Sequence, residues 1–343
     1  MPGHPPVPAD WPALPDEQLL DLRLCDLPLT IDGSALTGRI AALRAELSER
    51  DLRVPVHFYL ADEWFTPDGT AAVAIPFYLA HPRLEKLEEA QMLEIEGGEH
   101  EWCMRILRHE TGHAVDNAYR LRLRRQRRGL FGSPTVPYPE FYAPRPYSKS
   151  FVLHLDAWYA QSHPDEDFAE TFAVWLTPDS QWQARYAGWP AAKKLEYIDA
   201  LMRSLRGRPA PVQNAGEVDP LRRIRTTLRQ HYRRKRRHYG VEPTGMHDRE
   251  LRLLFSDAPE AAGNITAAQF IARMRRPVRR AVAQWTGIYQ YTIDQVLEEM
   301  IARCQQLKLR LALPEDQARQ EFTVLLTVQV MNYLHSGGHR LVL

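Results

Sequence analysis

The chain has 343 residues, of which 44% are hydrophobic and 25% charged, and its formal net charge is +1. These values are typical of an ordinary globular protein with a sizeable core and room for two domains. No apolar run approaches the length of a membrane span, and the amino terminus lacks a basic start followed by an apolar core. Three cysteines far apart (Cys25, Cys103 and Cys304) argue against a disulfide framework. We therefore expect a cytoplasmic protein with no membrane partner.

The first 30 residues are rich in proline and predict an extended amino-terminal arm. Apolar residues at helical spacing then predict a helix over residues 32–50. Residues 54–60 alternate like a strand, and residues 71–79 form a second apolar strand after a turn at Asp68-Gly69. Helix and strand signals conflict over residues 83–96. The pattern predicts a small sheet next to the helix that follows.

Residues 109–113 read His-Glu-Thr-Gly-His, which is the HExxH pattern of zinc hydrolases. Residues four apart on a helix share one face, so His109 and His113 can bind one zinc ion through neutral imidazoles. Glu110 then lies beside the open coordination position, where it can take a proton from water. Two ordinary helix histidines are the alternative.

A helix from Glu99 to about Arg128 is predicted around this pattern. Trp102 and Ile106 are four residues apart, and His109 follows Ile106 after three. The imidazoles therefore continue the apolar face of the helix that we expect to be buried. Buried imidazoles beside a buried carboxylate are costly without a partner, and a metal ion removes that cost.

A third ligand has its best source in a second helix that starts at Pro164. Glu166 and Glu170 share a face there; one would bind zinc and the other would orient a ligating histidine. His163 is a competing ligand, or a loop histidine before a proline. Asp116, one turn beyond the second histidine, is either an outer hydrogen-bond acceptor or a solvated helix residue.

The segments HETGHAVDNAY and EDFAETFA resemble the gluzincin metallopeptidases, with the nearest likenesses in the catalytic domain of anthrax lethal factor and the Mlc titration factor A peptidases. The likeness covers roughly residues 105 to 176. It implies that Glu166 is the ligand and Glu170 the orienting group, and that Tyr159, seven residues before the ligand, stabilises the oxyanion. The chain departs from these relatives at Asp167, where many have phenylalanine.

The resemblance also implies an α+β fold, with a zincin-like catalytic domain over residues 31–205 that holds Zn2+. In such enzymes an exposed edge strand pairs with the extended substrate. Residues 71–79 are the candidate for that strand, and an internal strand with both edges paired is the alternative.

Residues 129–150 are crowded with proline and aromatic residues, which predicts a long irregular loop. This loop would either wall the active-site cleft or cover the core. Arginine-rich runs at 120–128 and 233–237 end predicted helices, where cations favour the helix dipole. Their alternative role is binding an acidic partner such as nucleic acid, but no recognised nucleic-acid fold accompanies either run.

Residues 206–217 predict a linker, and residues 218–343 a helical carboxy-terminal domain that packs on the catalytic core or presents a surface to a protein partner. Helices are indicated at 219–240, from a capping box at Thr266, at 288–311 and at 314–334, and Pro277 should interrupt or kink the second of them.

The function predicted is zinc-dependent hydrolysis of a peptide or related amide bond, with Glu110 as the general base. The alternative is a non-catalytic zinc protein whose arginine-rich helix ends bind an anionic partner.

Overall fold

The structure is a computed structural model that describes residues 7–139, 142–240 and 248–335. The described residues have the α+β architecture that the sequence predicted, and they are mostly helical with two two-stranded sheets, of which only the first was predicted. Of the described residues, those in 7–91 and 95–234 form one compact unit, and those in 92–94 and 235–335 form another.

The first unit contains the predicted helix α2 (Ala35–Glu49) and the predicted parallel strands β1 (His57–Ala61) and β2 (Ala72–Pro76). The Ser34 side chain caps α2 by accepting a hydrogen bond from the backbone N–H of Leu36. One face of α2 is buried, as its spacing predicted. Helix α3 (Pro82–Met92) follows η3 (Phe77–Ala80) and forms most of the segment 83–96, where the sequence signals conflict.

The connection from β1 to β2 determines which strand edge is free. Before β2 begins, the chain passes along its far side, where the Phe65 carbonyl accepts a hydrogen bond from Ala74 N at 2.8 Å. Strand β2 therefore lies between β1 and Phe65, and all five of its residues are buried. The prediction that residues 71–79 form an exposed edge strand was wrong, because the connection itself pairs with that edge.

Helix α4 (His100–Tyr119) carries the HExxH residues and is shorter than predicted. It ends where Arg120 adopts a left-handed backbone conformation (φ 52°). Next, η4 (Leu121–Leu123) and α5 (Arg125–Phe131) replace the single helix expected up to Arg128. The Asp116 carboxylate accepts a hydrogen bond from Arg122 N at 2.7 Å, so a side chain satisfies this backbone donor beyond the helix end.

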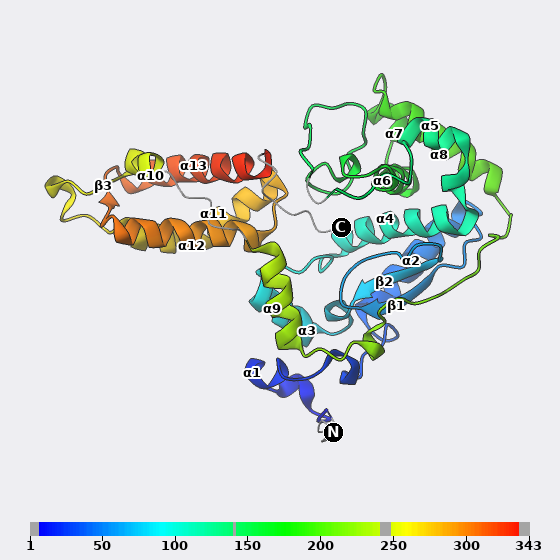
Figure 1. The fold of residues 1–343 in the computed structure, drawn as a ribbon, viewed down its shortest axis with the longest axis horizontal. Coiled ribbons are helices and arrows are strands. Elements are labelled where there is room, and N and C mark those ends of the chain that lie inside the picture. Colours follow the sequence, from blue (N-terminus) through cyan, green and yellow to red (C-terminus); the bar gives the residue numbers. More distant parts are fainter. Residues whose placement is uncertain (1–6, 140–141, 241–247, 336–343) are drawn as a thin grey trace. The chain divides into compact units, whose positions relative to one another are not determined.

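Helix α6 (Pro164–Leu176) starts at the predicted proline and packs closely on α4. In Figure 1, α4 lies between α6 on one side and β1, β2 and α2 on the other. The helices are in close contact at Gly112, where an added Cβ would lie 2.9 Å from Ala169 Cα. Two further helices, α7 (Trp182–Arg185) and α8 (Ala191–Leu205), complete this side, with α8 against α6.

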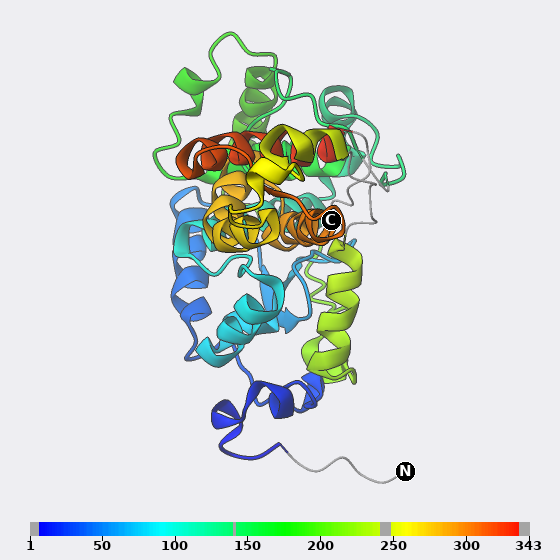
Figure 2. The ribbon, with the colours of Figure 1, turned by 90° about the vertical axis from the view of Figure 1, so that its left-hand side faces the viewer.

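The amino-terminal segment is not the extended arm that its prolines predicted. It contains short helical turns, η1 (Trp11–Ala13), α1 (Asp16–Leu19) and η2 (Leu24–Asp26), and the side chains of Leu19 and Leu24 are fully buried. Its backbone pairs with the segment before α9 (Leu228–Tyr239), since Leu24 N donates to Thr226 O. Figure 2 shows these turns beside the start of α9. Burial of leucine and this pairing order the segment, and residues 1–6 lie outside the described residues.

The predicted linker also belongs to the first unit. Val212 N donates to Ala118 O at 3.1 Å, and Ala71 N donates to Asn214 O at 3.0 Å, so residues 206–217 pack along this unit. The boundary between the units falls after Arg234, within α9, which is preceded by η6 (Leu221–Arg223) and begins later than predicted.

The second unit is helical, as predicted. The capping box of Thr266 and Gln269 is present, but α11 continues through Pro277 without the predicted interruption. Its elements are α10 (Asp248–Leu254), β3 (Phe255–Ser256), η7 (Pro259–Ala261), α11 (Ala267–Thr286), α12 (Gln290–Gln306), β4 (Arg310–Leu311) and α13 (Glu315–His335). Within the described ranges, no helix combines the length and hydropathy needed to cross a membrane.

Gly112→Ala should destabilise the protein, because the added methyl group would press on the α6 backbone. Overpacking costs roughly 1–3 kcal/mol, against a gain in helix propensity of up to about 1 kcal/mol. Gly38→Ala is the matched control, since Gly38 is an exposed residue of α2 with nothing within 4 Å of the new methyl group. Urea denaturation should show a lower midpoint for Gly112→Ala and an equal or higher one for Gly38→Ala. A Gly112→Ala protein as stable as wild type would contradict the close approach.

Candidate metal centre

Four residues from two helices meet at the contact between α4 and α6. His109 and His113 share one face of α4, and Glu166 and Glu170, at the same spacing, share the facing side of α6. The His109 side chain and both glutamates are buried, and His113 is partly exposed. The structure thus brings together the two imidazoles and the two carboxylates that the sequence singled out.

Three donor atoms converge on one point. Glu166 Oε2 lies 3.0 Å from His109 Nε2 and 3.1 Å from His113 Nε2, and the two Nε2 atoms are 3.2 Å apart. Zinc bonds of 2.0–2.1 Å in a tetrahedral site place neighbouring donors about 3.3 Å apart. These three side chains therefore fit a tetrahedral metal ion with one position left open.

Glu170 has a different role from Glu166, because its oxygens are already engaged. Its Oε1 accepts a hydrogen bond from His109 Nδ1 at 2.8 Å, and its Oε2 accepts one from Leu155 N at 2.8 Å. With Nδ1 as the donor, neutral His109 directs the lone pair of Nε2 toward Glu166 Oε2. Electron-rich atoms that face each other in a buried site need a cation or a proton between them.

The electrostatics of the centre favour positive charge. Burial by itself lowers the pKa of His109, but hydrogen bonds with Glu166 and Glu170 raise this pKa well above its usual value. Burial likewise raises the pKa of Glu166, yet His113 and His109 hold that pKa well below its usual range. A fixed carboxylate beside two imidazoles is the setting in which a divalent cation is stabilised.

Glu110 is oriented by a residue that sequence reasoning missed. Thr66 Oγ1 donates a hydrogen bond that is shared between Glu110 Oε2 at 2.8 Å and the backbone oxygen of Glu110 at 3.0 Å. Glu110 Oε1 has no hydrogen-bond partner within the part of the chain that the structure describes, so one carboxylate oxygen is held and the other is free. Thr66 follows Phe65 in the connection that covers the far edge of β2. Nothing in the local sequence signals this contact, because it depends on the path of that connection.

Tyr159 lies beside the candidate ligands. Its ring contacts that of His109, with centroids 5.4 Å apart, and its hydroxyl makes no hydrogen bond to any described residue. Burial, and to a smaller extent the nearby carboxylates, raise the pKa of Tyr159 well above its usual value. The phenol therefore stays protonated and can donate a hydrogen bond. Ala157 and Trp158, just before it, both have left-handed backbone (φ 54° and 55°), and such strain is common where a side chain must be positioned for function.

The irregular loop reaches the centre through Tyr138, which sequence reasoning did not select. The Tyr138 hydroxyl donates to Glu166 Oε1 at 2.8 Å, and its ring stacks on His163 with centroids 3.7 Å apart. This contact supports the view of the loop as a wall of the site. Residues 140–141 of the loop lie outside the described residues.

His163 is not directed at the centre. Its Nδ1 accepts a hydrogen bond from Asp165 N, which caps α6, and its Nε2 lies 2.8 Å from Val136 O. Both ring nitrogens are therefore used to join the loop to the start of α6, and the competing ligand role was wrong.

Asp116 is neither the outer acceptor nor the solvated residue that the sequence suggested. Its buried carboxylate accepts hydrogen bonds from Arg122 N and from Arg127 Nη2 at 2.8 Å. The same Arg127 nitrogen donates to Asp165 Oδ1, so this buried ion pair joins the end of α4 to the start of α6. Two arginines of the first basic run thus have structural roles.

Comparison with known protein families, curated proteins and solved structures gave no match for this chain.

Tyr138→Phe should weaken Zn2+ binding by roughly tenfold, because loss of an outer hydrogen bond to a ligand typically costs 10- to 100-fold in affinity. The hydroxyl is the only group removed, and the aromatic stack on His163 is kept. Competition with a chromophoric chelator measures the affinity. Tyr147→Phe, in the same loop but with a 96% exposed side chain, is the control that should bind Zn2+ like wild type. Equal affinities for the two variants would rule out this role for Tyr138.

Proposed function

We propose that this chain is a zinc-dependent hydrolase of peptide or related amide bonds, with a catalytic part of the gluzincin, zincin-like type. The single observation that carries the proposal is the convergence of His109 Nε2, His113 Nε2 and Glu166 Oε2 at mutual distances of 3.0–3.2 Å, next to the Glu110 carboxylate.

His109, His113 and Glu166 would hold the ion, and Glu170 would orient His109. When bound, zinc supplies Lewis acidity, which activates water and polarises a carbonyl group. The candidate ligand set contains three protein residues among those described, which favours an exchangeable fourth position over a closed structural site.

The remaining residues have defined proton and charge roles. Glu110 Oε1, left free because Thr66 holds Oε2, accepts the proton of the attacking water and then passes it to the leaving amine nitrogen. The Tyr159 hydroxyl, which stays protonated, donates to the substrate carbonyl oxygen as that oxygen gains negative charge. Tyr138 holds the outer oxygen of Glu166 and closes one side of the site.

The alternative is a non-catalytic zinc protein with an anionic partner such as nucleic acid. It has less support, because Arg122 and Arg127 of the first basic run form internal ion pairs with Asp68, Asp116 and Asp165. A different amide substrate, such as a cell-wall peptide, would use the same residues. The helical second unit as a protein-partner surface also remains a proposal.

Purified protein should contain stoichiometric zinc, and His113→Ala should lose it, because two donors no longer define a tetrahedral site. His100→Ala is the control, since His100 is an exposed residue at the start of the same helix. Mass spectrometric metal analysis after dialysis gives the ratio of metal to protein. Zinc retained by His113→Ala, or absent from wild type, would refute the assigned ligand set.

Glu110→Gln should keep the zinc and lose hydrolysis, with a rate reduced by roughly 10²- to 10⁴-fold because the general base is gone. Cleavage of a fluorescence-quenched peptide library, with zinc content determined on the same samples, tests both parts. Glu101→Gln, an exposed acid on the same helix, should be as active as wild type. Full activity in Glu110→Gln would exclude this mechanism, whereas a zinc-loaded wild type that cleaves nothing would favour the non-catalytic alternative.

A further inference from the structure

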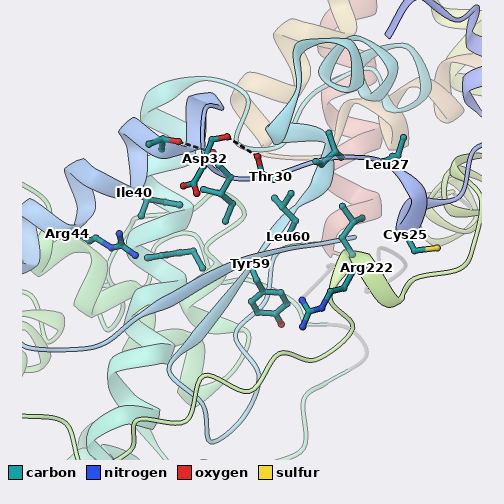
Figure 3. A pocket seen from close by; sticks show the side chains of 14 residues that line it. Cys25, Leu27, Thr30, Asp32, Ile40, Arg44, Tyr59, Leu60 and Arg222 are labelled. Carbon is teal, nitrogen blue, oxygen red and sulfur yellow. Dashed lines mark hydrogen bonds between the residues drawn. The ribbon is translucent and has the colours of Figure 1, made fainter. Parts of the chain in front are cut away.

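A groove runs along β1, at the edge of the sheet opposite to Phe65 and Thr66. It has a volume of about 430 Å³. Its walls are the segment 25–32, the face of α2 that carries Thr37, Ile40 and Arg44, the strand itself and the start of η6. Figure 3 shows Leu60 and Tyr59 on the strand, Leu27 and Thr30 across the groove, and Ile40 on α2.

Along this groove, the backbone of β1 pairs with none of the described residues. In a parallel pair, alternate residues direct their N–H and C=O groups to the same neighbour. His57 N donates to Ala71 O, so His57, Tyr59 and Ala61 face β2. The N–H and C=O groups of Phe58 and Leu60 therefore face the groove, and they have no hydrogen-bond partner among the described residues.

The walls of the groove combine apolar side chains with two charged groups that form no ion pair with a described residue, Arg44 on α2 and Asp32 at the end of the segment 25–32. Apolar residues include Leu27, Ile40 and Leu60. The Arg44 guanidinium lies 5.7 Å from the centre of the Phe58 ring and forms no ion pair with a described residue. Arg222, also in the wall, is instead paired with Glu217.

We propose that this groove binds an extended peptide segment, which adds to β1 as a third strand and places an acidic side chain beside Arg44. Two donors and two acceptors at every second residue, about 6.6 Å apart, match the backbone of a strand. The apolar walls accommodate the alternate side chains, and the unpaired guanidinium selects for negative charge. This site is distinct from the metal centre and needs no zinc.

The proposal is tested with the full chain and a fluorescein-labelled seven-residue peptide of alternating valine and threonine with a central glutamate. Fluorescence anisotropy in the presence of EDTA should show saturable binding. Two further peptides carry N-methyl groups on one or the other alternate set of amides. Binding should be abolished only when the methylated amides are those that face β1. Equal binding of both methylated peptides would overturn strand addition.

Charge selectivity provides the second measurement. A central lysine in the peptide, or Arg44→Glu in the protein, should weaken binding by roughly tenfold, because like charges face each other across the interface. Arg125→Glu makes the same change of net charge at an exposed residue outside the groove and should leave binding unchanged. The proposal fails if wild type binds none of the peptides, or if Arg44→Glu binds like Arg125→Glu.

Sedimentation of the free protein tests a second copy of the chain as the occupant. Dimerisation that Arg44→Glu abolishes and that the peptide does not displace would overturn the proposal in favour of self-association. If the protein as purified contains no zinc or cleaves no peptide, yet binds the labelled peptide, only the proposed catalytic function is refuted, so the two failures are distinguishable.

Discussion

The close contact between α4 and α6 is the constraint on which the centre depends. Two helices carrying ordinary side chains pack with their axes 8–10 Å apart, and the backbones come closer only where a side chain is missing. Gly112 provides that position within the HExxH segment, facing the backbone of Ala169. Ala169 lies between Glu166 and Glu170 in the chain, so this close contact is beside the point where the imidazoles meet the carboxylates. The packing and the site therefore share one cause.

The start of α6 is crowded with buried carboxylates, and their partners decide what each one does. Asp165 pairs with Arg127, and Asp167 with Lys194 Nζ at 2.6 Å. Burial raises the pKa of Asp167 to about 7, although Lys194 acts in the opposite direction. Glu170 is held by a histidine and a backbone amide. Glu166 alone directs an oxygen at both candidate histidines, so the assignment of ligand and orienting group follows from which cations and donors surround each acid.

The two edges of the β1–β2 sheet differ in whether another segment of the chain covers them. One edge is covered by the connection between the strands. The same connection contains Thr66, which forms a hydrogen bond with Glu110. At the other edge, beside a groove, the backbone groups of Phe58 and Leu60 have no partner in the described part of the chain (Figure 3). An open edge is normally a liability for aggregation, so a short strand set in a walled groove limits which chains can pair with it.

The sequence by itself determined the elements whose signals are local. Helical spacing predicted α2 and most of α4, Pro164 marked the start of α6, and the capping box at Thr266 marked the start of α11. Spacings of four residues also placed each pair of candidate ligands on one helix face, because that relation depends only on helix geometry.

The tertiary structure alone decided the contacts between distant segments. Thr66 and Tyr138 reach the centre from a strand connection and an irregular loop, and the Asp116 carboxylate is taken by Arg127. The edge covered by Phe65 likewise depends on the path of a connection. No local pattern encodes these partners, because a long-range contact depends on the packing of the whole unit and not on the propensity of the residues that make it.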